Sequence, residues 1–412
     1  MKAYSNPISV TNQFAFCGLP LRLDTYAGCA FRCSYCFARY RGGYSYPDEI
    51  RPANPERIET AFSRALTSDK APSGVVGQFL RRRTPVHFGG MSDPFQPAEK
   101  HYRVTEAVLR ILAKWSYPTV ISTKGALIGD PVYMRHLQQI RFVVVQFSFS
   151  TTRDEIAKRV EPHSTPPSLL LRVMEKLSML GVTVTCRWQP YIPGVSETPE
   201  EFVPRIASTG AHHLGIEHLK VPMERNRPLW NVLVNGVGKD LHREYLRLGS
   251  QRIAREYVLP PEQKLPTILQ VAGLVRKNGM TFGSADNEFQ YLSDTACCCS
   301  GVDQFPGFEN WFKHQIGYAV RLCRGKTIRY EAISKQWSPT GSIERYLNSH
   351  CRRSTGERGA SMKHYVRTKW DNPLAADGPA SFFGVIPTGH VTRSGRRTYE
   401  WDPDVDLGPL VP

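Results

Sequence analysis

The sequence predicts an α/β fold: a parallel barrel of the TIM type with about six β/α units, followed by a basic C-terminal extension. Two observations support this prediction. Apolar segments alternate with amphipathic segments between about residues 20 and 290, which is typical of parallel strands joined by helices. Lys and Arg outnumber Asp and Glu beyond residue 310, outside the alternating region. We expect an N-terminal segment (1–20), the barrel (21–290) and a C-terminal region (291–412) with cysteines and basic and aromatic residues.

The expected strands are short, apolar and rich in β-branched residues. They lie at residues 21–26, 84–90, 118–124, 141–150, 182–192, 211–219 and 280–285. The expected helices repeat apolar residues at helical spacing and lie at residues 101–115, 131–140, 167–181, 200–209 and 264–279. Residues 225–258 are long for a barrel loop, so we expect a functional insertion or lid there, helical in its second half. Active sites of such barrels lie at the C-terminal ends of the strands.

The composition is that of a globular protein, with 412 residues of which 41% are hydrophobic and 22% charged. No apolar run is long enough to cross a bilayer, and the N-terminus has no apolar signal core. We therefore expect a cytoplasmic protein, in a reducing environment, without a membrane partner. There the ten cysteines are expected to be metal ligands, redox thiols or core residues. The net charge of +16 favours nucleic acid as a partner, and a basic solvated surface without such a partner is an equal alternative.

Three cysteines, Cys29, Cys33 and Cys36, lie within eight residues of the stretch YAGCAFRCSYCFARY. A zinc site usually pairs its ligands, and no second pair follows at zinc-finger spacing. Thiolates also hold iron–sulfur clusters, and three thiolates on four irons leave one iron open. Gly28 suits a loop that wraps closely around a bound group. Three buried cysteines without a metal are the weakest interpretation, because such clustering is rare by chance.

The spacing CxxxCxxC, with Tyr35 before the third cysteine and Phe37 after it, resembles the signature of the radical S-adenosylmethionine (radical SAM) enzymes. The resemblance implies that Cys29, Cys33 and Cys36 hold a [4Fe–4S] cluster whose fourth iron binds SAM. One electron, from a reductase such as flavodoxin or ferredoxin, then cleaves SAM to methionine and a 5′-deoxyadenosyl radical, which abstracts hydrogen from the substrate. The family has a partial (β/α)6 barrel, which agrees with the alternating pattern.

The expected strand ends supply candidates for binding SAM. The resemblance implies that the pair Gly89–Gly90 contacts the methionine amino group; most members carry an acidic residue next, where this chain has Met91. The other candidates are Ser92, Lys124, Ser148 (or Ser150) and Arg187. Taken alone, such a serine or lysine is more often solvated or capping. His212, His213 and His218 are expected to be ordinary core or surface residues.

Two stretches, SDPFQP (92–97) and PYIPG (190–194), resemble the spore photoproduct lyase-like branch of the family, and this resemblance covers about residues 20–220. That lyase carries a cysteine at the end of strand two that returns hydrogen to the product radical. Here no cysteine lies between Cys36 and Cys186. The candidate hydrogen donors are therefore Cys186, Tyr35 and Cys298, unless 5′-deoxyadenosine itself returns the hydrogen.

The C-terminal region adds candidates for a second site and for the substrate. Cys297, Cys298 and Cys299, with Cys323 and Cys351, are a possible second metal or cluster site, and redox thiols and buried cysteines are the equal alternative. Residues 311–370 carry 13 Lys and Arg against 3 Asp and Glu, interleaved with aromatics. Basic residues neutralise phosphates and aromatics stack on bases. The substrate-binding candidates are Asp286, Asn287, Glu288, Arg321, Arg324 and Trp337. A small domain with an aromatic core and a basic rim is the alternative.

Together these observations favour a radical SAM enzyme that acts on a nucleic-acid base, with DNA as the expected substrate. The reaction would be a base modification or rearrangement, for example of a thymine C5 substituent, or a repair of the photoproduct type. The absence of the strand-two cysteine favours modification. One alternative is a radical SAM enzyme that acts on a peptide or small molecule. Another is a non-catalytic iron–sulfur protein that binds nucleic acid.

Overall fold

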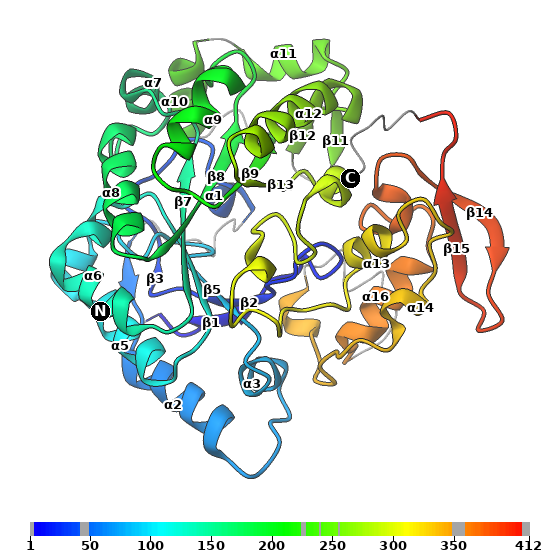
Figure 1. Cartoon of the computed structure of the whole chain (residues 1–412), viewed down its shortest axis with the longest axis horizontal. Helices are drawn as coiled ribbons and strands as arrows, with labels where there is room; N and C mark the ends of the chain where they lie inside the picture. The colour runs from blue at the N-terminus through cyan, green and yellow to red at the C-terminus, as the bar shows by residue number, and fades with distance from the viewer. Residues whose placement is uncertain are drawn as a thin grey trace. The chain divides into compact units, whose positions relative to one another are not determined.

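A computed structural model describes residues 4–41, 49–223, 228–238, 240–253, 256–347 and 359–405 of the chain (Figure 1). The chain divides into two compact units, each assembled from separated stretches of sequence. Unit 1 contains Met1–Pro7, Leu23–Pro55 and Phe88–Phe282, and unit 2 contains Ile8–Arg22, Glu56–His87 and Gly283–Pro412. In the described part of the chain, no helix is both long and apolar enough to cross a membrane.

The main sheet has the strand order β1-β2-β5-β6-β7-β8-β9-β13. Its strands are β1 (Ile8–Val10), β2 (Leu21–Leu23), β5 (Val86–Phe88), β6 (Thr119–Thr123), β7 (Val143–Phe149), β8 (Thr183–Tyr191), β9 (His213–His218) and β13 (Thr281–Ser284). From β6 to β9 each strand pairs in parallel with the next. Among the described strands β1 and β13 are the two edges, so the sheet is open. The predicted α/β class is confirmed, and each expected strand segment contains one of these strands.

Helices follow the strands of unit 1, and in Figure 1 the helices α6, α8 and α9 flank β7 and β8. The helices here are α4 (Glu99–Tyr102), α5 (Val104–Lys114), α6 (Pro131–Gln139), α7 (Asp154–Val160), α8 (Pro167–Met179), α9 (Pro199–Ala207) and α12 (Pro261–Lys277), with the 3-10 turn η2 (Ala126–Gly129). The helix expected at 101–115 corresponds to α5 but begins later, at Val104, because Arg103 has a left-handed backbone (φ +50°) and separates α4 from α5. The indole of Trp188 stacks on Phe202 at 3.8 Å, which joins β8 to α9.

The insertion at 225–258 is packed rather than loop-like where the structure describes it. It forms α10 (Pro228–Val237), α11 (Leu241–Arg247), β11 (Gln251–Ile253) and β12 (Glu256–Val258), and β12 lies between β11 and β10 (Val221–Pro222). Buried Trp230, Leu233 and Tyr245 join one apolar cluster with Val160 of α7. The helical expectation for its second half holds for α11 alone, because residues 251–258 contain two antiparallel strands. The insertion therefore backs the end of α7.

Unit 2 has an aromatic core. Its elements are α2 (Pro55–Thr67, which starts at the boundary with unit 1), α3 (Val75–Arg81), η3 (Asn287–Leu292), η4 (Val302–Gln304), α13 (Ile316–Leu322), α14 (Glu331–Ser334), η5 (Glu344–Tyr346), α16 (Met362–Trp370), η6 (Pro379–Ser381) and the hairpin β14 (Val385–Val391) with β15 (Arg397–Trp401), red in Figure 1. Trp370 contacts Tyr330 and Tyr399 edge-on, at ring distances of 5.3 and 5.8 Å. Phe14 packs on Tyr365 in the same way, at 5.6 Å. Buried rings thus hold stretches together that lie far apart in the sequence.

Candidate active site

The loop with the three cysteines runs from β3 (Tyr26–Ala27), which pairs with β4 (Arg51–Pro52), to α1 (Phe37–Arg41). Gly28 has φ +90°, a conformation that side chains other than hydrogen rarely allow. The Gln96 side chain holds the loop on both sides: its amide nitrogen donates to the Gly28 carbonyl (3.1 Å), and its oxygen accepts from the Ala30 N–H (2.8 Å). Ser34 Oγ donates to the Val160 carbonyl at the end of α7 (2.7 Å). The loop is therefore fixed by residues from two other segments.

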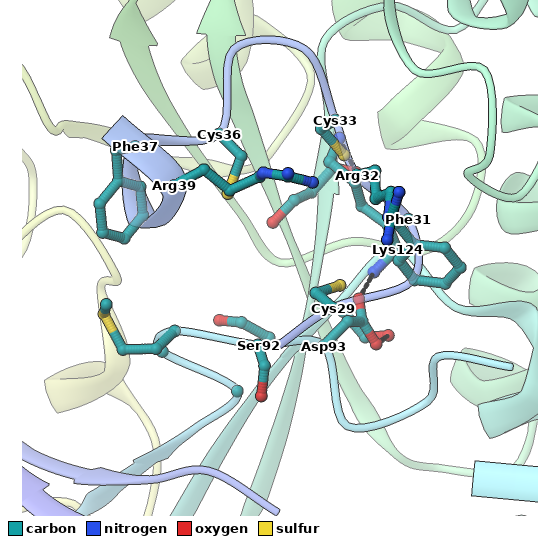
Figure 2. A pocket seen from close by; sticks show the side chains of 16 residues that line it. Cys29, Phe31, Arg32, Cys33, Cys36, Phe37, Arg39, Ser92, Asp93 and Lys124 are labelled. Atoms are coloured by element: carbon teal, nitrogen blue, oxygen red, sulfur yellow. Dashed lines mark hydrogen bonds between the residues drawn. The ribbon is translucent and has the colours of Figure 1, made fainter. Parts of the chain in front are cut away.

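Cys29, Cys33 and Cys36 all line one cavity that opens to solvent. The loop curves around this cavity, and Figure 2 shows it with Ser92, Asp93 and Lys124 among the lining residues. The other lining residues include Gly89, Gly90 and Ser148. The cavity is lined by most of the residues that the sequence predicts for the cluster and for SAM.

Burial raises the pKa of all three thiols, to about 12 for Cys29 and in the same direction for Cys33 and Cys36. The carboxylates of Asp93 and Glu161 add to the rise at Cys29 and Cys33. Without a metal these groups are thiols at neutral pH, and a bound iron would displace their protons.

No three His, Cys, Asp or Glu side chains within the described ranges are arranged around a single metal ion. A [4Fe–4S] cluster does not need that arrangement, because each thiolate binds a different iron. Three thiols at the edge of one cavity fit such a cluster. The predicted second metal site at Cys297–Cys299 and Cys323 gains no support from the described residues, and Cys351 lies outside them.

The glycine pair follows β5, and the backbone there is tightly enclosed. Gly89 has φ +89°, and a Cβ at this position would lie 2.5 Å from the Ser122 carbonyl oxygen. Gly89 N–H donates to the Leu23 carbonyl at 2.9 Å. Both the positive φ and the lack of space for a Cβ require glycine at this position. The backbone of Gly89 is therefore not covered by a side chain of its own at the cavity wall.

Asp24, buried after β2, holds the residues that follow the glycine pair. One of its carboxylate oxygens accepts from the N–H groups of Met91 (2.8 Å) and Ser92 (3.1 Å). Ser92 Oγ donates to the Tyr26 carbonyl at 2.6 Å, just before the cysteine loop. Ser92 therefore lines the cavity and also joins the ends of β3 and β5.

Asp93 fixes the end of β6. Its carboxylate accepts from the Lys124 N–H (2.6 Å), from Thr123 Oγ1 (2.8 Å) and from the Phe95 N–H (2.9 Å). Burial raises the pKa of Asp93 to about 6, although these hydrogen bonds act in the opposite direction. The SDPFQP stretch is thus a structural clamp in which Asp93 holds the β6 end and Gln96 holds the cysteine loop.

Lys124 is paired with a buried carboxylate that the sequence analysis missed. Its ammonium lies 3.0 Å from Glu161 Oε1 and 3.1 Å from the Ser148 carbonyl. Tyr35 and Ser150 also donate their hydroxyl groups to Glu161 Oε1. Burial raises the pKa of Glu161, but Lys124 and the two hydroxyls outweigh it, so the pKa is lowered and the carboxylate stays charged. Glu161 orients both Lys124 and Tyr35 at this side of the cavity.

The other candidates of unit 1 are not among the lining residues. Cys186 is fully buried in β8, where it lies opposite Phe147 and Leu214. Arg187 is half-buried and lies opposite Ser148 in the sheet. The hydroxyl of Tyr35 is directed to Glu161. The histidines follow the ordinary expectation: His213 is buried with its ring against Thr281 Oγ1 (2.8 Å), and His218 is buried while the His212 side chain is exposed.

The predicted substrate residues and Cys298 belong to unit 2. Asp286 is fully buried, whereas Asn287 and Glu288 are half-buried at the start of η3. Arg321 and Arg324 are half-buried on and after α13. Burial lowers the pKa of Arg321 to about 10, and the neighbouring Arg324 adds to this.

Most of the aromatic residues expected to stack on bases are core residues instead. Buried rings are Trp311, Phe312, Tyr330, Tyr365 and Trp370, and half-buried ones are Tyr318, Trp337 and Tyr346. The reason is that this unit uses aromatic side chains for its core. Trp337 keeps an accessible part, with the guanidinium of Arg82 4.7 Å above its ring and Phe79 5.5 Å away. The alternative of an aromatic core is therefore correct for five of the eight rings.

An Asp93→Asn variant is expected to lose about 1–3 kcal/mol of unfolding free energy. The asparagine amide would face the Lys124 N–H as a second donor, so one hydrogen bond of the β6 end is replaced by an unpaired buried group. Urea denaturation at neutral pH measures the loss. Asp130→Asn is the matched control, because Asp130 is exposed and its side chain caps nothing in α6. Equal costs for the two variants would contradict the proposed clamp.

Known proteins resemble parts of this chain. Uncharacterized proteins of Mycobacterium tuberculosis and Mycobacterium bovis are 28% identical over 204 residues, which is 47% of this chain and 57% of theirs. The chain thus spans under two thirds of the length of these relatives. A solved structure of a spore photoproduct lyase variant has 14% identity and a TM-score of 0.49, covering 68% of this chain and 78% of that one. SuiB of Streptococcus suis has 11% identity and a TM-score of 0.41, covering 65% of this chain and 49% of that one.

A family model, described as the radical SAM superfamily, matches residues 23–204. The matched segment contains the three cysteines, the glycine pair, Lys124 and Glu161. The resemblance seen in the cysteine motif is confirmed over residues 23–204, which match the radical SAM superfamily.

Proposed function

We propose that this protein is a radical SAM enzyme that modifies or rearranges a nucleic-acid base. One observation carries the proposal. The three cysteines of the CxxxCxxC motif line a single cavity together with Gly89, Gly90 and Lys124, within a segment that matches the radical SAM superfamily.

Cys29, Cys33 and Cys36 would hold the [4Fe–4S] cluster. When bound, the cluster and SAM supply a 5′-deoxyadenosyl radical that takes a hydrogen atom from the substrate, after one electron has come from a small reductase of the flavodoxin or ferredoxin kind. Gly89 and Gly90 would contact SAM through their backbone, and Ser92 and Ser148 through their hydroxyl groups. Lys124 offers a positive charge to the SAM carboxylate, and Glu161 and the Ser148 carbonyl fix its ammonium at the cavity.

The proposal of a modification follows from the thiols near the cavity. Among the described lining residues, the motif cysteines are the only thiols. Cys186 is enclosed in the sheet, and the Tyr35 hydroxyl is hydrogen-bonded to Glu161. This supports a reaction in which unit 1 donates no hydrogen atom and 5′-deoxyadenosine returns its own. Photoproduct repair, which needs a donor, is the second choice.

Charge supports nucleic acid as the substrate. The chain has a net charge of +16. Among the described residues between 311 and 370 of unit 2, the exposed basic side chains are Lys326, Arg329, Lys335, Arg345, Lys363 and Arg367. Basic side chains bind phosphates with little regard to sequence, and an accessible indole beside a guanidinium, as at Trp337, suits an unstacked base. Asp286, Asn287 and Glu288 remain proposed contacts to the substrate.

The test is the formation of 5′-deoxyadenosine by the anaerobically reconstituted, reduced protein with SAM, with and without DNA. We expect DNA to stimulate the reaction several-fold, and we expect the stimulation to fall as salt rises, because phosphate contacts release counterions. A Lys326→Glu, Arg329→Glu double variant should lose the stimulation and keep the basal cleavage. Cleavage indifferent to DNA but stimulated by peptides or metabolites would reject the nucleic-acid substrate and retain the radical chemistry. No cleavage by cluster-loaded protein would reject both.

A further inference from the structure

Within unit 2, Cys17 lies next to the three consecutive cysteines Cys297–Cys299, which we call the cysteine triplet. Cys17 and Cys297 are about 280 residues apart in the sequence. The Phe312 N–H donates to the Gly18 carbonyl, and the Gly317 N–H donates to the Ala15 carbonyl, both at 2.9 Å. A Cβ on Gly18 would lie 2.5 Å from Cys297 Sγ, so the backbone beside Cys17 touches the triplet directly.

Polar groups converge on the sulfur of Cys298. The Cys17 thiol is hydrogen-bonded to it. Cys297 Sγ donates to it at 3.7 Å, and Ser300 Oγ lies 3.1 Å away. Cys299 is a further hydrogen-bond partner. Cys297 and Cys298 are buried, whereas Cys17 and Cys299 are half-buried. Two residues of the group, Cys17 and Cys299, therefore keep partial exposure to solvent.

The backbone around this group is held in place. The Gly301 N–H donates to the Cys298 carbonyl (3.1 Å), and Gly301 has φ +61° in a tight turn. The Ala296 N–H donates to Asp303 Oδ2 at 2.7 Å, and the Gln315 amide donates to the Cys297 carbonyl. These hydrogen bonds therefore fix the backbone of the turn that carries Cys297 and Cys298.

The hydrogen bonds around Cys298 favour its charged form. The Cys17, Cys297 and Cys299 thiols, in that order, lower the pKa of Cys298 well below its ordinary value, against the effect of burial. The pKa of Cys17 is raised, first by its hydrogen bond to Cys298 and then by burial. A thiolate next to a protonated thiol is the arrangement that attacks disulfides.

We propose that Cys17 and Cys298 form a redox-active dithiol that closes reversibly into a disulfide, with a low-molecular-weight disulfide as oxidant. The Cys298 thiolate attacks one sulfur of the oxidant, forms a mixed disulfide and releases one thiolate. The Cys17 sulfur then loses its proton, attacks Cys298 and expels the second thiolate. Two protein thiols are oxidised, and one external disulfide is reduced to two thiols. Excess reduced thiol reverses both steps.

Cys17 is the preferred partner for a geometric reason. A disulfide between the sequence neighbours Cys297 and Cys298 would close a small ring that contains their planar peptide bond, and it would depart from ordinary disulfide geometry. Cys17 belongs to a distant segment of the chain, so a disulfide between Cys17 and Cys298 would not close a small ring through a peptide bond. A shared metal ion is the competing use of four cysteines, and no such metal-binding group exists among the described residues.

The experiment uses the anaerobically purified full chain, equilibrated in buffers of increasing oxidised over reduced glutathione. Free thiols are then blocked by alkylation and the peptides are mapped by mass spectrometry. We expect a disulfide-linked peptide of Cys17 and Cys298 to accumulate as the oxidant ratio rises and to disappear on reduction. Cys323, half-buried in the same unit, should remain a free thiol and be recovered in its alkylated form. In a Cys17→Ser variant we expect a glutathione adduct trapped on Cys298; a Cys298→Ser variant should form neither product.

Three results would overturn the proposal. One is that Cys17 and Cys298 are still free thiols, and are therefore alkylated, at oxidant ratios that already oxidise Cys323. A second is a dominant Cys297–Cys298 linkage. The third is a stoichiometric metal that protects these thiols and is lost in Cys298→Ser. Wild-type mapping decides the matter alone if a variant fails to fold.

Discussion

A Cys33→Ala variant is expected to lose cluster binding and 5′-deoxyadenosine formation to the detection limit. Cys33 is buried at the cavity with Cys29 and Cys36, and removal of one thiolate leaves a second iron without a protein ligand. Iron content, about four per reconstituted chain for one such cluster, and the visible absorption of the cluster measure the loss. Because burial raises the thiol pKa values, iron loading of the wild type should also weaken as the pH falls.

The matched control is Cys323→Ala, which removes a half-buried thiol of unit 2. It should keep full iron content and SAM cleavage. A variant with alanine at Cys29, Cys33 and Cys36 that kept its activity would refute the cluster assignment and with it the proposed enzyme.

A Glu161→Gln variant is expected to lose about 3–5 kcal/mol of unfolding free energy. The side chains of Lys124 and Glu161 are only 12% and 5% exposed, so the variant leaves an ammonium group buried without its counter-ion. Denaturant unfolding measures the cost. Glu244→Gln is the control, because its partner Arg247 is 69% exposed and such pairs contribute under about 1 kcal/mol.

A double variant distinguishes this effect from general damage to the site. Lys124→Met with Glu161→Gln removes both charges and should be more stable than Glu161→Gln alone. The pH dependence has a defined sign. The lowered pKa of Glu161 gives stability that is present above the ordinary carboxyl range and is lost as the pH falls through the lowered value. The gap between wild type and Glu161→Gln should therefore close in acid. A double variant no more stable than Glu161→Gln would contradict the ion pair.

The sequence predicted what depends on local pattern. Alternating apolar segments located the strands, and the cysteine spacing located the cavity, together with the glycine pair that follows β5. Lys124 and Ser148 could be predicted because active sites of parallel sheets gather at strand ends.

Residues that act through tertiary contacts were missed. Glu161 lies in a turn after α7 with no motif around it, and its importance follows only from the buried Lys124. Asp93 and Gln96 stood within a noted stretch, but their partners come from β6 and the cysteine loop. The contact between Cys17 and Cys298 could not be predicted from the sequence, because it depends on how unit 2 folds.

The aromatic residues of 311–370 show a second limit of sequence patterns. A ring that stacks on a base and a ring that fills a core have the same spacing, and only burial separates them. Trp370 and Tyr365 are fully buried, whereas Trp337 is not.

The interleaving of the two units has a consequence for synthesis on the ribosome. The chain passes from one unit to the other after residues 7, 22, 55, 87 and 282. Unit 1 cannot be completed until Phe282 has left the ribosome. Unit 2 also needs its last stretch, Gly283–Pro412, although its earlier stretches Ile8–Arg22 and Glu56–His87 are synthesised long before. Neither unit is one continuous stretch of sequence, so a fragment that contains only one unit cannot be made by trimming the ends of the chain.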